Sequence, residues 1–145
     1  MKNELENIVY YADTDSYGVV WHGTYLRWME QGRVEFCRNA GIDLVELHNN
    51  DIVIPVTNLN IRYKSSAKLE DRIVIETSIS KVSPITVTFS QVIKEKYTGK
   101  IFIQAEVEVV AVNGEGRIYR RMPDVIKSAC EKAMEEELCR DLISI

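Results

Sequence analysis

Hydrophobic positions recur with two different periods along this chain, and each period predicts one kind of element. Between residues 24 and 40 they recur every three or four positions, the spacing of a helix that buries one face. These positions are Tyr25, Met29, Gly32, Phe36 and Ala40. Thr24 is the expected N-cap and Gly41 the expected stop, so the pattern predicts a helix of about 17 residues.

Elsewhere the period is two, which is typical of β-strands with one buried face. The clearest run covers residues 101–112, where Ile103, Ala105, Val107 and Val109 alternate with polar residues. The expected strands are 5–12, 52–63, 73–79, 85–95 and 101–112. A helical turn is expected over 44–48, and Met122-Pro123-Asp124 opens a short final helix.

This order of elements predicts an α+β domain in which one curved antiparallel sheet wraps a long central helix. A single sheet layer leaves its edge strands open, so we expect dimerisation edge to edge. The length of 145 residues predicts one domain, residues 1–145.

The charge balance and the cysteines narrow the function classes. A formal net charge of −4 argues against nucleic acid as the main partner. Apolar stretches are too short for a membrane span of about 20 residues, and the polar N-terminal sequence is unlike a signal peptide, so a cytoplasmic location is expected. Three cysteines at unpatterned spacings indicate buried or half-buried thiols and no metal site. The two histidines have no cysteine or carboxylate at the spacing of metal ligands, which also argues against a metal site.

Candidate chemistry lies in the loop between the first strand and the long helix. Asp13 and Asp15 end the strand, Gly18 follows, and the helix begins soon after. A carboxylate beside the amide end of a helix can supply a base or nucleophile and a site for a developing oxyanion. Asp13 is expected to bind loop amides. For Asp15 the residues alone leave two interpretations open, a capping role in the loop and a catalytic one.

A longer pattern around this loop makes the chain similar to a known family. The residues read Asp-x-Asp-x-x-Gly-x-Val-x-His-x-x-Tyr from Asp13 to Tyr25, and residues 61–71 and 121–123 add to the match. The chain resembles the hotdog-fold acyl-CoA thioesterases of the 4-hydroxybenzoyl-CoA thioesterase type. Within these it resembles most the short-chain acyl-CoA thioesterases associated with the Tol–Pal system.

The resemblance implies a hotdog fold and hydrolysis of an acyl-CoA or aryl-CoA without metal or cofactor. It maps the catalytic carboxylate onto Asp15 and the oxyanion donor onto the backbone amide of His22. It also implies Gly18, Val19 and Tyr25 as substrate-binding residues, and a homo-oligomer, with a dimer of dimers preferred. The bulky Tyr17 stands where the family has a small residue, which leaves the acyl preference open.

Several alternatives stay open at this point. The acyl group could be delivered by a carrier protein, or the chain could be a non-catalytic module that binds acyl thioesters. Glu30 is a rival carboxylate, although it lies about 9 Å along the helix and pairs more plausibly with Arg33. The cations expected as candidates for the phosphates of CoA are Arg62, Lys64, Lys68, Arg120 and Arg121.

Overall fold

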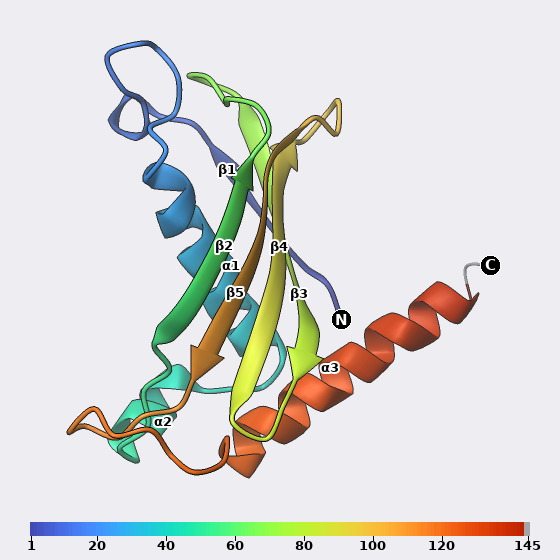
Figure 1. Cartoon of the computed structure of the whole chain (residues 1–145). Coiled ribbons are helices and arrows are strands. Elements are labelled where there is room, and N and C mark those ends of the chain that lie inside the picture. Colours follow the sequence, from blue (N-terminus) through green and yellow to red (C-terminus); the bar gives the residue numbers. More distant parts are fainter. Residues whose placement is uncertain (144–145) are drawn as a thin grey trace.

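The computed structural model describes residues 1–143 of the chain (Figure 1). The strands are β1 (Asn3–Ile8), β2 (Val56–Tyr63), β3 (Arg72–Val82), β4 (Thr86–Glu95) and β5 (Ile101–Val110). The helices are α1 (Thr24–Asn39), α2 (Leu44–Asn49) and α3 (Asp124–Ile143), and a 3₁₀ turn covers Tyr11–Asp13. Each predicted strand and helix is therefore present, and the predicted α+β class is confirmed. The single domain over residues 1–145 stays a prediction, and residues 144–145 lie outside the described part.

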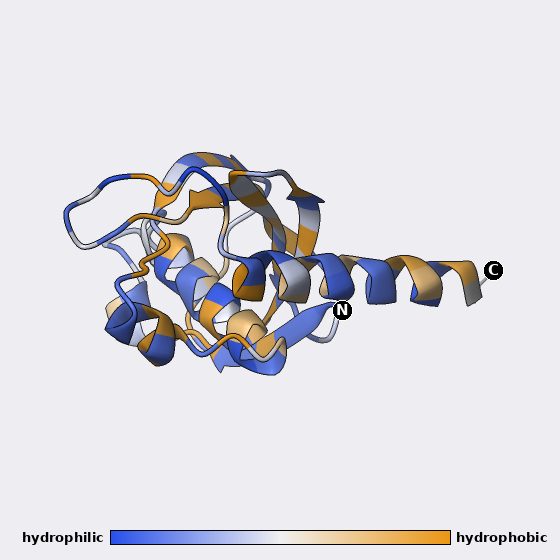
Figure 2. Cartoon of the chain, turned by 90° about the horizontal axis from the view of Figure 1, so that it is seen from below, coloured by the Kyte–Doolittle hydropathy of each residue, from blue (hydrophilic) through white to orange (hydrophobic). Residues whose placement is uncertain are grey.

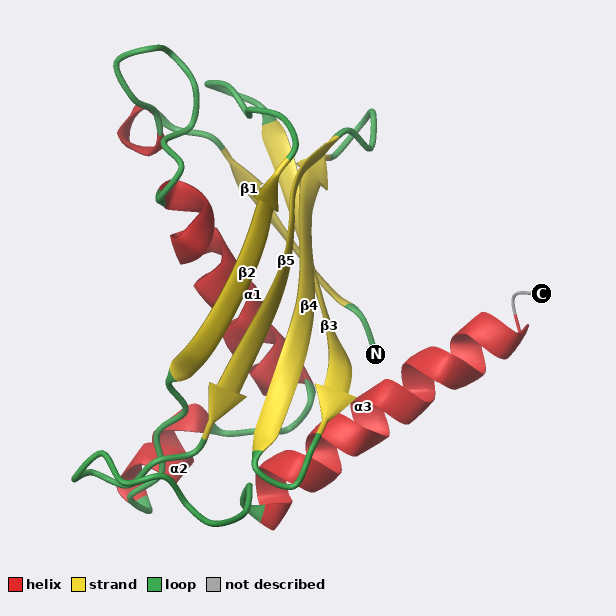
Figure 3. Cartoon of the chain, in the orientation of Figure 1, coloured by secondary structure: helices red, strands yellow, loops and turns green. Residues whose placement is uncertain are grey.

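All five strands form one antiparallel sheet in the order β1-β3-β4-β5-β2. Figure 3 shows α1 lying across one face of this curved sheet. The odd-numbered residues from Ile103 to Val109 of β5 are buried on that face, while Gln104, Glu106 and Glu108 alternate with them. The alternation read from the sequence thus separates the core face from the polar face.

The helix α1 packs unusually close to the sheet at Gly32. A Cβ atom there would lie 2.7 Å from the Ile75 side chain and 2.7 Å from the Thr77 hydroxyl. Beside it Gln91 is fully buried, and its amide nitrogen donates to the Met29 carbonyl and the Thr77 hydroxyl, each at 2.9 Å. The absence of a side chain at one helix position therefore allows this close contact.

The sheet has two edge strands, β1 and β2, and β2 exposes an apolar strip. Its core-facing residues pair with buried residues of β5, yet most of them are exposed. Val56, Leu59 and Tyr63 are between 39% and 45% exposed. An apolar strip along an edge strand is the kind of surface that another chain covers.

Three details differ from the sequence prediction. The final helix α3 is 20 residues long rather than short, and its second half extends beyond the sheet (Figure 2). The first strand ends at Ile8, because residues 11–13 form the 3₁₀ turn. The N-cap of α1 is Gly23 rather than Thr24, whose hydroxyl donates instead to the Asp13 carbonyl. In the described residues, no helix is long and apolar enough to cross a bilayer.

Candidate active site

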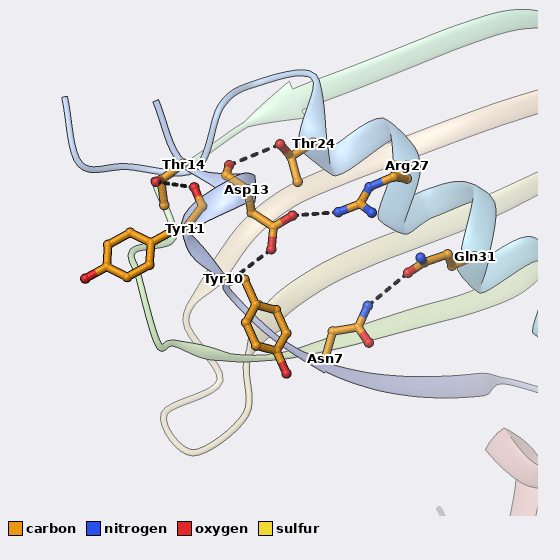
Figure 4. A network of polar contacts seen from close by, with 8 residues as sticks. All are labelled: Asn7, Tyr10, Tyr11, Asp13, Thr14, Thr24, Arg27 and Gln31. Atoms are coloured by element: carbon orange, nitrogen blue, oxygen red, sulfur yellow. Dashed lines mark hydrogen bonds and ion pairs between the residues drawn. The ribbon is translucent and has the colours of Figure 1, made fainter. Parts of the chain in front are cut away.

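The loop between β1 and α1 is fastened to the helix by Asp13. Its buried carboxylate accepts a hydrogen bond from the Tyr10 backbone N–H at 2.9 Å and from the Arg27 guanidinium at 2.6 Å (Figure 4). Its carbonyl oxygen accepts from the Trp21 N–H and the Thr24 hydroxyl. Asp13 binds a loop amide, as predicted, while its partner on α1 was not foreseen. One residue thus joins the end of β1, the following turn and the first turns of α1.

Asp15 lies in the tight turn that follows Asp13. Its N–H donates to the Val19 carbonyl at 2.8 Å, and an isolated bridge joins Thr14 to Val20. The turn closes at Gly18, whose φ of +80° lies in the left-handed region that glycine favours. The chain therefore folds back and brings Asp15 beside the segment that leads into α1.

The Asp15 side chain is half-buried and has one recorded partner. Its Oδ1 atom accepts a hydrogen bond from the Tyr17 N–H at 2.8 Å. This bond is the capping interaction that the sequence left open, and it fixes the carboxylate in one orientation. The Tyr17 side chain is 89% exposed, so it extends into solvent from this turn.

Backbone N–H groups gather where α1 begins. Gly23 has no side chain with which to cap the helix, and within residues 1–143 no acceptor is recorded for the N–H groups of His22 and Gly23. The Trp21 ring folds over Gly23, where an added Cβ would lie 2.4 Å from it. The Tyr63 hydroxyl donates to the His22 carbonyl at 2.9 Å, which links this end of α1 to β2. Uncapped amides at a helix start form an anion-binding arrangement.

The three residues predicted to bind substrate have different environments. Gly18 is exposed in the turn, and Val19 is half-buried and bridged to Lys68. Tyr25 is only 2% exposed, and its hydroxyl accepts a hydrogen bond from the Ala67 N–H. Burial raises the pKa of the Tyr25 hydroxyl. We therefore assign Tyr25 a supporting position beneath the site.

The rival carboxylate Glu30 lies apart from Asp15, on the wall of a cavity further along α1. Glu30 is exposed, and it is not within ion-pair distance of Arg33 among the ion pairs of residues 1–143. Burial lowers the pKa of Arg33, and the nearby charge of Glu30 partly offsets this, so the predicted interaction is present at longer range. The Arg33 guanidinium donates instead to the Gln91 side chain at 2.9 Å. Burial raises the pKa of the Cys37 thiol to about 11, so this group stays protonated at neutral pH. Within residues 1–143, no three His, Cys, Asp or Glu side chains lie together in a way that could hold a metal ion.

A cavity that the sequence did not reveal lies further along α1. It has a volume of about 410 Å³ and is partly open to solvent, and it is lined by α1 from Glu30 onward, by α2, by the segment 52–56, by the sheet and by the start of α3. Neither Asp15 nor His22 is among its lining residues. Its walls come from five parts of the chain, so no local pattern could have predicted it.

Comparisons with known proteins agree with this architecture. The sequence profile of the thioesterase-like superfamily matches residues 9–130. The acyl-CoA thioesterase YbgC of Haemophilus influenzae is 38% identical over 84 residues, which are 57% of this chain and 62% of that protein. The acyl-CoA thioester hydrolase YbgC of Escherichia coli O6:H1 is 31% identical over 106 residues, which are 72% of this chain and 78% of that protein.

Similarity also extends to solved structures. A crystal structure of 4-hydroxybenzoyl CoA thioesterase complexed with 4-hydroxybenzoyl CoA superposes with a TM-score of 0.80 at 18% identity. The superposition covers 89% of this chain and 98% of the other. At this identity the likeness concerns the fold, and it confirms the predicted hotdog arrangement.

Proposed function

This chain belongs to the thioesterase-like superfamily, and we propose that it hydrolyses the thioester bond of an acyl-CoA or aryl-CoA. The products are a free carboxylic acid and CoA. One observation carries the proposal: a half-buried carboxylate, Asp15, is held in a fastened turn beside the segment that leads into the uncapped start of α1.

Thioester hydrolysis requires few groups besides the Asp15 carboxylate and the amides at the start of α1. A thiol with a pKa near 8.5 is a tolerable leaving group, so a strong general acid is dispensable. Asp15 attacks the carbonyl carbon to give a mixed anhydride, or it takes a proton from a water that attacks instead. In either route the C–S bond breaks and the sulfur leaves as thiolate. In the first route a water then hydrolyses the anhydride and restores Asp15. In both routes one water is consumed, and the proton that it releases passes to the thiolate or to solvent.

The backbone amide of His22 is the proposed oxyanion donor, supported by its neighbour Gly23. The developing negative oxygen is stabilised by amide hydrogens and by the positive end of the helix. Loss of one such donor typically costs about 2.7–4 kcal/mol of transition-state stabilisation. The bond from Tyr63 to the His22 carbonyl holds this peptide in place. We propose Gly18 and Val19 as the residues that pass closest to the acyl thioester.

A second copy of the chain completes the proposed enzyme. Two β2 edges related by a two-fold axis pair antiparallel, which covers the exposed apolar strip that contains Val56, Leu59 and Tyr63. This pairing brings the Val56 end of one strand towards the Tyr63 end of the other, so each site lies at the seam. We propose a dimer on these grounds, and a dimer of dimers as the working assembly.

We also propose a cytoplasmic location. The three cysteines are free, and Cys37 and Cys130 are buried. Unlinked thiols of this kind are typical of a reducing compartment.

The substitution Asp15→Asn tests the function. It keeps the size of the side chain and removes the base or nucleophile, so kcat should fall by at least about 100-fold while binding of CoA thioesters persists. The assay is release of CoA detected with a thiol-trapping dye. Glu30→Gln makes the same chemical change at the rival carboxylate, which lines the cavity along α1, and should lower kcat far less than Asp15→Asn.

Two other results would overturn the proposal in different ways. Activity that survives Asp15→Asn and is lost in Glu30→Gln would move the chemistry to α1. Binding of acyl-CoA without turnover by the wild type would make the chain a binding module. The exposed Lys64 and Lys68 near the site could meet either CoA phosphates or an acidic carrier protein, so acyl groups on both carriers are compared.

A further inference from the structure

The cavity along the second half of α1 has the properties of an acyl-chain site. Its volume of about 410 Å³ falls within the range of roughly 300–1,000 Å³ that is common for small-molecule pockets. Most lining residues are apolar, and they include Val34, Ile42, Leu47, Ile54, Phe89 and Ile126. An aliphatic group would therefore meet hydrocarbon on most sides.

The polar groups in the walls are few, and none of them is a buried group that carries an unpaired charge. Burial raises the pKa of the Cys37 thiol to about 11 and that of Cys130 to about 12, so both are uncharged at neutral pH. The Arg33 guanidinium is bonded to the buried Gln91. Glu30 and His48 are exposed, so each can keep contact with water. No charged group in this set needs a charged ligand as its partner.

The position of the cavity suits an acyl group that comes from the neighbouring copy. Val56, at the start of β2, is one of its lining residues, and Tyr63, at the other end of β2, holds His22. These two ends of one strand are about 23 Å apart, which is too far for one acyl chain within a single copy. Antiparallel pairing of two β2 edges brings the cavity of one copy towards the reacting end of the other.

We infer that the substrate carries a medium-length aliphatic acyl chain, which lies in the cavity of one copy while its thioester lies at Asp15 of the second copy. This inference rests on the proposed function and on the pairing of β2. An engineered cavity of about 150 Å³ holds the six carbons of benzene, so by proportion the 410 Å³ here has room for about 16 carbons, and a less tightly packed mobile chain of about 8–12 carbons fits within it.

A chain-length series on the wild-type protein tests the inference. The thioesters are acetyl-, butanoyl-, hexanoyl-, octanoyl-, decanoyl- and benzoyl-CoA, with CoA release as the readout. Each methylene buried in the cavity should raise kcat/KM about fourfold, so each step of two carbons should give about 15-fold until the cavity is full. A profile that is flat with chain length, or that favours benzoyl-CoA, would refute the inference and leave the thioesterase function intact. No hydrolysis of any of these thioesters would refute both.

A cavity-filling variant gives a second measurement. Val34→Phe places a larger side chain in the cavity, and the ratio of kcat/KM for decanoyl-CoA to that for acetyl-CoA should fall at least about tenfold. Val45→Phe is the matched control: it is the same change on α2, at a position that is 71% exposed and outside the cavity lining. The ratio should be unchanged in the control. An unchanged ratio in a folded Val34→Phe protein would refute the inference, and the wild-type series decides it should that variant not fold.

Discussion

Asp13 anchors the active-site turn to α1, and Asp13→Asn tests how much its carboxylate contributes to the stability of the fold. The substitution keeps shape and volume and removes the negative charge. An asparagine offers one acceptor oxygen where the carboxylate offers two, so its amide nitrogen faces either the Tyr10 N–H or the Arg27 guanidinium, both of which are donors. One of the two hydrogen bonds is lost, and a buried donor is left facing another donor.

The expected loss in the free energy of unfolding follows from the burial of Asp13 and Arg27. Hydrogen bonds to charged groups contribute about 1.5–3 kcal/mol, and breaking a fully buried ion pair costs about 3–5 kcal/mol. The side chain of Asp13 is 4% exposed, but that of Arg27 is 61% exposed, so water compensates part of the loss. We therefore expect the free energy of unfolding to fall by about 1.5–3 kcal/mol.

Urea unfolding at one fixed protein concentration measures this change. With a slope of about 2 kcal/mol per molar, the midpoint should fall by about 0.7–1.5 M and the slope should stay constant. Arg27→Gln and the double variant complete a cycle that isolates the coupling between the two side chains. A loss below about 0.5 kcal/mol for Asp13→Asn would show that the turn is held by its other contacts. Because the turn carries Asp15, kcat should also fall by about tenfold to a hundredfold, with little change in KM.

Two further predictions concern the core and the thiols. Gly32→Ala gains helix propensity of about 1 kcal/mol but places a methyl group 2.7 Å from the Ile75 side chain, so the variant should be destabilised by about 1–3 kcal/mol in thermal or urea unfolding. In the folded protein at pH 8, a thiol reagent should label Cys139, which is exposed, and should reach Cys37 and Cys130 only after denaturation. Since burial raises the folded pKa of Cys37 from 9.0 to about 11, stability from this group is full below about pH 9 and is lost as the pH rises to about 11. The part of the loss that comes from Cys37 should be absent in Cys37→Ala, while the part from Cys130, whose pKa burial raises to about 12, should remain. Fast labelling of all three thiols would contradict the burial.

The elements that the sequence predicted well are those with a local signal. The long helix was expected over residues 24–40 and runs from Thr24 to Asn39, because its apolar period and Gly41 are both readable in one stretch. The strands of the sheet carry the same kind of information. Along each strand, successive side chains point to opposite faces of the sheet, whichever strand lies beside it, so the pattern can be read from one stretch of sequence.

The length of α3 was missed for a related reason. Its second half lies beyond the sheet and buries little, so it shows no apolar stripe from which a period could be read. The residues there are mostly good helix formers, namely Met, Glu, Leu and Arg. Propensity rather than periodicity was the signal for this segment.

The contacts that define the site connect residues far apart in the sequence. Tyr63 and His22 are 41 positions apart, and Arg33 and Gln91 are 58 apart. The family pattern indicated that Asp15 and His22 belong together, but it did not reveal what holds them. Such pairs follow from strand order and register, which only the folded chain establishes.

These long-range contacts share one element, α1, and this determines how the site works. Its start is fixed by Asp13 and by the bond from Tyr63, and its middle is fixed against the sheet at Gly32 and Gln91. The cavity lies along the half that follows. Because a helix is stiff over this length, a displacement of its middle moves both the amides at its start and the cavity wall that it forms for the other copy. A substitution that displaces the helix at Gly32 should therefore disturb catalysis and acyl selectivity together, although it touches neither Asp15 nor the acyl chain.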